Sequence, residues 1–159
     1  MPLTTKGIAV QILGSVRTHR THASICTVND CKVVINHLVR KFSEPLTKES
    51  RHKRMKSVTV SAGDAGDTVE DHAIPVIVIV EHFLQLPDNK LDITEENIDL
   101  AISMLCDSLL LVEITRKEDN LISSSGYQRR MPDTWSTPGH PHYQDPTARY
   151  QAAGIELTS

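Results

Sequence analysis

Residues 109–126 read LLLVEITRKEDNLISSSG and contain the clearest secondary-structure signals in the chain. Residues 109–114 are apolar apart from Glu113, and this run has the length of a buried strand. Thr115 and Glu118 fit the capping-box pattern T-x-x-E that begins a helix, and Gly126 is well placed to end it. The stretch therefore predicts a strand followed directly by a short helix.

Helical patterns lie on both sides of this stretch. Apolar residues recur at helical spacing over residues 31–42, with Asp30 as the expected N-cap. Pro75 suits the first turn of a helix through residue 86, although the Val and Ile content of that segment also fits a strand. Thr94 or Asp92 suits the cap of a helix through about residue 107. Residues 7–16 are apolar but fit a helix or a strand equally well. Most of the chain is therefore predicted to be helical.

Further strand patterns are short. Residues 57–61, SVTVS, are β-branched and alternate in polarity, which predicts a strand. Residues 68–74 follow a glycine-containing turn and are expected to form the second arm of a hairpin. Together with residues 109–114, they predict a mainly helical single α+β domain with a small antiparallel sheet.

The last thirty residues differ in composition from the rest. We expect a compact α+β domain in residues 1–126 and an extended, proline-containing tail in residues 127–159. Asp145 and Pro146 form an N-cap and N1 pair, which predicts a short terminal helix. This helix is expected to pack on the body or on a partner subunit, so a homo-oligomer is expected as well.

The composition of the chain indicates its cellular compartment. Three cysteines without a framework spacing indicate a reducing compartment, and the apolar runs are too short to span a membrane. A cytoplasmic bacterial protein with no membrane contact is expected. Only 4% of the residues are aromatic, and this low content argues against a surface on which nucleic-acid bases stack.

The charge of the chain is unevenly distributed. Residues 1–60 contain 11 Lys and Arg against 3 Asp and Glu, whereas the remainder contains 6 against 17. One interpretation is a polyanion partner, DNA or RNA, and the other is that the two halves face each other within one chain or across a dimer. The first interpretation assigns phosphate contacts to the basic residues of one region: Arg40, Lys41, Lys48, Arg51, Lys53, Arg54 and Lys56.

Asp71 and His72 begin the sequence DHAIP at residues 71–75. This stretch resembles the D-H-x-x-P start of His-Me finger (HNH) nucleases. The resemblance implies that His72 is a general base, and that Asp71 or Asp67 holds a divalent metal such as Mg²⁺. The family pattern continues with an Asn and a last His on a helix, whereas an apolar segment follows here. The alternative is a helix N-terminus, at which Glu70 and Asp71 meet the helix dipole.

A second group of metal-ligand types occurs near the N-terminus. His19, His22, Cys26 and Cys31 lie within thirteen residues, and imidazole with thiolate is a suitable donor set for zinc. Their spacing matches no finger motif. The alternative is that the two cysteines are reduced and buried, so zinc binding is left open.

Several pieces of the C-terminal half resemble uncharacterised bacterial proteins carried on mobile DNA, such as phages and integron cassettes. The pieces are Asp71–Pro75, Leu109–Ile114, Thr115–Asp119, Arg129–Pro132 and Asp145–Tyr150. The resemblance implies a bacterial origin but no activity. The physical alternative for Arg149 and Tyr150 is packing on a helix surface.

Three functions remain as hypotheses. The first is a small mobile-element protein that contacts nucleic acid through its basic region without a cofactor. The second is a metal-dependent nuclease with His72 as general base, and the third is a non-catalytic oligomeric interaction protein. Whether the chain is an enzyme is left open at this stage.

Overall fold

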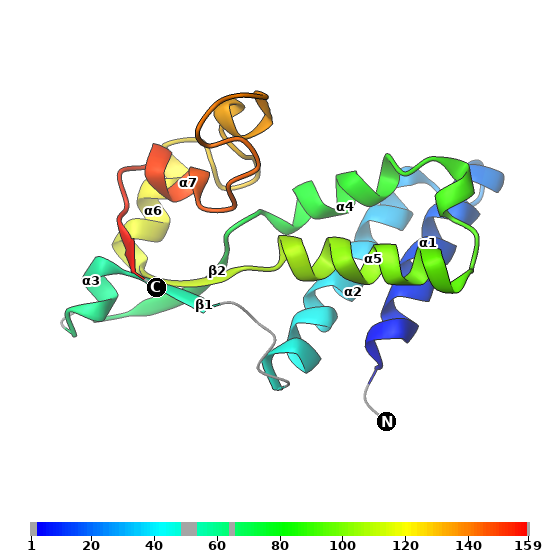
Figure 1. Cartoon of the computed structure of the whole chain (residues 1–159), viewed down its shortest axis with the longest axis horizontal. Coiled ribbons are helices and arrows are strands. Elements are labelled where there is room, and N and C mark those ends of the chain that lie inside the picture. The colour runs from blue at the N-terminus through cyan, green and yellow to red at the C-terminus, as the bar shows by residue number, and fades with distance from the viewer. Residues whose placement is uncertain (1–2, 49–53, 64–65, 159) are drawn as a thin grey trace. The chain divides into compact units, whose positions relative to one another are not determined.

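The computed structural model describes residues 3–48, 54–63 and 66–158, with side chains for all of these except residues 44–48 (Figure 1). The chain is a mainly helical α+β domain with a small sheet, which confirms the predicted class. Backbone contacts divide it into two compact units. We name them the helical unit (residues 1–51 and 76–108) and the sheet unit (residues 52–75 and 109–159). The boundary predicted after residue 126 falls within the sheet unit.

The helical unit contains α1 (Thr5–Thr21), α2 (Val28–Lys48), α4 (Val76–Leu84), the 3-10 helix η1 (Asp88–Lys90) and α5 (Glu95–Ser108). Helix α1 contacts α2, α4 and α5, and α2 also contacts α4. Residues 7–16, which fitted a helix or a strand, lie in α1. The apolar residues of α1 fall on one buried stripe: Ile8, Ala9, Ile12, Leu13 and Val16.

The sheet unit contains β1 (Arg54–Ser57), α3 (Val58–Ser61), β2 (Thr68–His72), β3 (Leu111–Thr115), α6 (Arg116–Ser124), η2 (Asp133–Ser136), α7 (Ala148–Ala152) and β4 (Leu157–Thr158). The strand order is β2-β3-β1-β4. Strand β3 pairs antiparallel with β2 and parallel with β1, and β1 pairs antiparallel with β4. The sheet is therefore mixed and not purely antiparallel. The long connection between β1 and β3 provides the crossover that a parallel pair requires.

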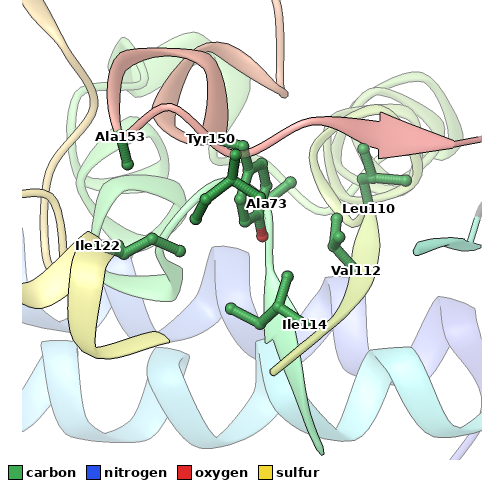
Figure 2. Close-up of a cluster of buried hydrophobic side chains, with 8 residues drawn as sticks. Ala73, Leu110, Val112, Ile114, Ile122, Tyr150 and Ala153 are labelled. Carbon is green, nitrogen blue, oxygen red and sulfur yellow. The ribbon is translucent and has the colours of Figure 1, made fainter. Parts of the chain in front are cut away.

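Helices α6 and α7 cover one face of this sheet (Figure 1). Figure 2 shows Tyr150 of α7 next to Ala73, within the buried cluster that joins these helices to the strands. The members are Ala73, Leu110, Val112, Ile114, Ile122, Tyr150, Ala153 and Ile155. The predicted tail thus contributes three residues to the core of its own unit.

The predicted hairpin over residues 57–61 and 68–74 is wrong. Residues 54–57 provide the strand, and β2 pairs with β3 instead. Residues 58–61 form the single helical turn α3, which Ser57 caps by accepting a hydrogen bond from the Val60 N–H at 3.2 Å. The β-branched composition favoured a strand. The Ser57 cap holds the turn instead, and the side chains of Ser57 and Thr59 help to lower the pKa of the Glu118 carboxyl in α6.

Helix signals that depend on nearby residues are confirmed. Thr115 and Glu118 form both bonds of the capping box, with Glu118 N donating to Thr115 Oγ1 at 3.1 Å and Thr115 N donating to Glu118 Oε2 at 2.8 Å. Gly126 follows α6 with a φ of 83°. Thr94 caps α5 by accepting from the Asn97 N–H at 3.2 Å.

Helix α2 begins earlier than predicted. Its first residue is Val28, and Thr27 is the N-cap instead of Asp30. Asp30 lies in the first turn and accepts from the Thr27 N–H at 2.8 Å and from the Thr27 hydroxyl at 2.6 Å. The two residues form a capping box in which aspartate takes the place of glutamate.

Candidate functional site

Asp71 of β2 meets Arg149 and Tyr150 of α7, which lie almost eighty residues further along the chain. Side chains alternate between the two faces of a strand. Val69 and Asp71 therefore share the face that α7 covers, and Val69 packs against the core of the sheet unit. Neither Arg149 nor Tyr150 was expected to be buried from the sequence.

A tight turn sets the start of α7. Asp145 Oδ1 accepts hydrogen bonds from the Thr147 N–H at 2.8 Å and from the Thr147 hydroxyl at 2.7 Å. Such turns fix the backbone just before a helix. Burial alone would raise the pKa of Asp145. The hydrogen bonds from Thr147 and Gln151 have the larger combined effect, so the pKa lies below its ordinary value. The turn directs Arg149 and Tyr150 inward.

Arg149 is only 2% exposed, and its guanidinium donates to four acceptors. Nε donates to the Ala73 carbonyl at 3.0 Å, and Nη1 donates to the Tyr127 carbonyl at 2.8 Å. Nη2 donates to the His72 carbonyl at 2.6 Å and to the Asp71 carboxylate. A buried charge is tolerated when it is paired and hydrogen-bonded in this way. The guanidinium therefore links α7, which carries it, to the end of β2 and to the segment that follows α6.

Tyr150 completes the arrangement, because its hydroxyl donates to Asp71 Oδ2 at 2.6 Å. Burial raises the pKa of Asp71, while the Arg149 guanidinium and the Tyr150 hydroxyl oppose that rise. Burial and the neighbouring Asp71 carboxylate also raise the pKa of Tyr150, so its hydroxyl remains a donor. We name these residues the Asp71–Arg149–Tyr150 cluster.

The cluster joins two of the sequence pieces that resemble mobile-element proteins, Asp71–Pro75 and Asp145–Tyr150. The contacts between the two pieces therefore give both of them a role in packing. The expectation that Arg149 and Tyr150 pack on a helix surface is wrong, since both are fully buried. A sequence signal for this was the apolar spacing of Ala148, Ala153 and Ile155 around them.

His72 is the last residue of β2. Its side chain leaves the strand on the face opposite to that of Asp71, because successive residues of a strand alternate. The two side chains predicted to be catalytic therefore do not converge on one point. The alternative interpretation placed Glu70 and Asp71 at a helix N-terminus. This placement is wrong, because both residues lie in β2 and not at the start of α4.

Asp67 lies at the other end of β2. Its carboxylate is 3.6 Å from Arg116 Nε, and its carbonyl accepts from the Arg116 N–H at 3.1 Å. Four residues of extended chain separate Asp67 from Asp71, a distance of about 13 Å. One ion cannot bind both carboxylates at that distance. Within the described ranges, no group of three or more His, Cys, Asp or Glu side chains could hold a metal ion.

The basic residues of α2 project from a single helix. Arg40 is exposed and its Nε donates to Asn36 Oδ1 at 3.0 Å, whereas Lys41 is half-buried. The side chain of Lys48, together with Arg51 and Lys53, lies outside the described residues.

The basic residues of β1 are paired on the sheet. Arg54 and Lys56 lie two positions apart and share one face of the strand. Arg54 Nη2 is 3.4 Å from Glu70 Oε2, and Lys56 Nζ is 3.8 Å from Glu113 Oε2. These cations therefore already have counter-charges across the strands.

Pairing of this kind accounts for much of the charge asymmetry. Among the residues whose side chains are described, six basic residues of the first sixty form ion pairs with acids of the remainder: Lys6–Glu95, Arg17–Asp92, Arg20–Asp88, Lys32–Glu81, Arg54–Glu70 and Lys56–Glu113. The helical unit carries 9 Lys and Arg against 10 Asp and Glu, and the sheet unit carries 8 against 10. Each unit is thus close to neutral, and the interpretation that the halves face each other within the chain gains weight.

The histidine and cysteine group near the N-terminus lies at the junction of α1 and α2. His19 Nδ1 is 2.9 Å from the Cys26 carbonyl, and His22 is exposed just after α1. Cys31 is 1% exposed, as the alternative of a buried, reduced cysteine requires, and Cys26 is half-buried. Zinc binding by this group stays a prediction.

Comparison of the chain with family models, with curated proteins and with solved structures gave no match. Among the helices of the described residues, none combines the length and apolar character needed to cross a membrane. Function must therefore be argued from the chain itself, and assembly into a homo-oligomer stays a prediction.

Proposed function

We propose that the chain contacts nucleic acid through a basic segment, which we define as residues 40–53. The supporting observation is the concentration of positive charge in this segment, which contains five Lys and Arg against two Glu. Arg40, at its start, is exposed on α2. Arg54 and Lys56, just after the segment, form ion pairs with Glu70 and Glu113, as do four basic residues nearer the N-terminus with other acids.

The chemistry of such a contact is electrostatic. Lys and Arg neutralise phosphates and release condensed counterions, so affinity falls as salt rises. Each phosphate contact contributes about −0.9 to the slope of log affinity against log salt on duplex DNA. Five contacts would weaken binding about 500-fold between about 50 and 200 mM salt. With few aromatic residues in the chain, contact with the backbone is favoured over base stacking.

The test is fluorescence anisotropy with labelled duplex DNA, single-stranded DNA and RNA at several salt concentrations. The test variant replaces five basic residues of the segment with glutamine: Arg40, Lys41, Lys48, Arg51 and Lys53. The control variant replaces five paired residues with glutamine: Lys6, Arg17, Lys32, Arg54 and Lys56. Both variants change the net charge equally, so a non-specific charge effect weakens binding equally in both.

We expect the test variant to lose binding and the control variant to retain most of it. Exposed ion pairs contribute little to stability, so both variants should remain folded, which circular dichroism checks. No binding by the natural chain at low salt, binding that is insensitive to salt, or equal losses in the two variants would each refute the proposal.

The nuclease hypothesis is a second candidate because His72 closes a strand, the position that a general base of that class requires. The engagement of Asp71 with Arg149 and Tyr150 leaves His72 as its main support. The measurement is plasmid cleavage with and without Mg²⁺. Cleavage that needs Mg²⁺ and disappears in His72→Ala, but not in His140→Ala, supports it. Equal cleavage by His72→Ala, or none by the natural chain, removes it.

A further inference from the structure

Cys26 and Cys31 flank the first turn of α2. Thr27 is the N-cap between them, and the Cys31 N–H donates to the Thr27 carbonyl at 3.1 Å, as the first helical bonds do. The capping bonds between Thr27 and Asp30 fix this turn. Cys26 is therefore the residue before the N-cap, and Cys31 is the fourth residue of the helix.

Side chains at these two positions pack against each other at many helix starts, an arrangement known as the hydrophobic staple. Here both positions hold thiols. Burial raises the pKa of the Cys31 thiol, and the nearby Cys26 thiol raises it further, which places the two groups within electrostatic reach. Cys31 is 1% exposed, whereas Cys26 is half-buried and open to a small reagent. The backbone of Cys26 is held on both sides, because its N–H donates to the His22 carbonyl at 2.8 Å and its carbonyl lies 2.9 Å from His19 Nδ1.

We propose that Cys26 and Cys31 are a redox-active pair that closes into an intramolecular disulfide when a low-molecular-weight disulfide of the glutathione type is the oxidant. The bond would covalently join the turn after α1 to the start of α2. The proposal is independent of nucleic-acid binding.

The reaction takes two exchange steps. The Cys26 thiol loses its proton to water, and its sulfur attacks one sulfur of the glutathione disulfide, so that one glutathione thiolate leaves. The Cys31 thiol then loses its proton, and its sulfur attacks the Cys26 sulfur of the mixed disulfide. The second glutathione thiolate leaves, and the Cys26–Cys31 bond remains. In total the protein loses two protons and two electrons, and the glutathione disulfide is reduced to two glutathione thiolates, which take up the two protons from water.

The test uses the full chain with Cys106→Ser, because the exposed Cys106 would otherwise form its own glutathione adduct. The folded protein is incubated with oxidised glutathione, alkylated with iodoacetamide and weighed intact by mass spectrometry. We expect a species that lacks two hydrogens and carries no alkyl or glutathione group. Peptide mapping should link Cys26 to Cys31, and dithiothreitol should reverse the change.

Two matched variants make the result specific. Cys31→Ala in the same background should stop at the mixed disulfide on Cys26, because the second thiol is missing. Thr27→Ala should close more slowly, since it removes the hydroxyl of the capping box that holds the two positions together. A looser turn slows closure because a disulfide forms only when the two Cα atoms come within about 7 Å of each other.

Four results would overturn the proposal. The first is two alkylated thiols after oxidation, and the second is a mixed disulfide that does not resolve in the protein with both cysteines. The third is a Cys26-linked dimer on a non-reducing gel in place of the intramolecular product. The fourth is closure of the disulfide only in urea, which would show that the folded turn keeps the two thiols apart.

Discussion

Replacing Arg149 with methionine removes the guanidinium of the Asp71–Arg149–Tyr150 cluster while keeping an unbranched stem. The substitution eliminates donors to the Ala73, Tyr127 and His72 carbonyls and to the Asp71 carboxylate. The carboxylate then remains in a largely buried position without its counter-charge. Tyr150 can still donate to it, but one neutral hydrogen bond does not replace an ion pair.

The expected cost follows from burial. Removing one partner of a buried ion pair destabilises a protein by about 3–5 kcal/mol. The Asp71 side chain retains 23% exposure, so solvent partly stabilises the unpaired charge and the lower end applies. We expect a loss of about 3 kcal/mol, which lowers Tm by about 6–12 °C in a chain of this size.

The assay is urea unfolding followed by two probes. Trp135 is the only tryptophan of the chain and belongs to the sheet unit, so its fluorescence reports on the unit that contains the cluster. Far-UV circular dichroism is dominated by the longer helices of the helical unit. Arg116→Met is the matched control. Its guanidinium is 56% exposed and lies 3.6 Å from Asp67, so its loss should cost less than about 1 kcal/mol.

Acid should reduce the effect. With the guanidinium absent, burial holds the pKa of Asp71 above its unfolded value unopposed by a cation. A raised folded pKa contributes stability below the unfolded pKa and loses it as pH rises through the folded pKa. The deficit of Arg149→Met should therefore be smaller at about pH 4 than at about pH 7. Equal losses in Arg149→Met and Arg116→Met, or no change with pH, would refute the role of the cluster.

Two further predictions concern the elements around it. Burial would raise the pKa of Glu118, but hydrogen bonds from Thr115, Ser57 and Thr59 outweigh burial and lower it, so its stabilisation is present at neutral pH and is lost as pH falls. The gap between the urea midpoints of the natural chain and Glu118→Gln should narrow from about pH 7 to about pH 4; a constant gap would contradict this. Gly126→Ala should cost about 1–2 kcal/mol in thermal melts, because φ is 83° at that position. Gly14→Ala in α1 should add about 0.5–1 kcal/mol, since no atom lies within 4 Å of the new Cβ; changes of the same sign in both would contradict the argument.

The sequence predicted the elements whose hydrogen bonds close within a few residues. The capping box of Thr115 and Glu118, the cap at Thr94 and the C-terminal glycine at 126 each depend on a bond or a φ angle inside one turn. The strand β3 was readable because residues 109–114 are apolar apart from Glu113, and four of the five residues of β3 are buried. In α2, however, not every apolar residue of the predicted helix faces the core, since Val34 is 46% exposed while Ile35 and Val39 are buried.

Tertiary structure alone decided the strand partners and the candidate site. Residues 58–61 form a helical turn capped by Ser57, and the side chains of Ser57 and Thr59 help to lower the pKa of Glu118, almost sixty residues away. Asp71 was predicted to hold a metal, and its engagement with Arg149 depends on a contact across most of the sheet unit. No local pattern encodes such a contact, since the free energy of pairing is realised only when the whole unit has folded.

The charge distribution divides in the same way. The sequence by itself determined that the first sixty residues are basic and the rest acidic. The fold decided that Lys56 meets Glu113, which faces it on the neighbouring strand β3, and that Arg54 reaches across β3 to Glu70 of β2. A charge pattern fixes which ion pairs a chain is able to form, and only the packing of strands and helices fixes which of them exist.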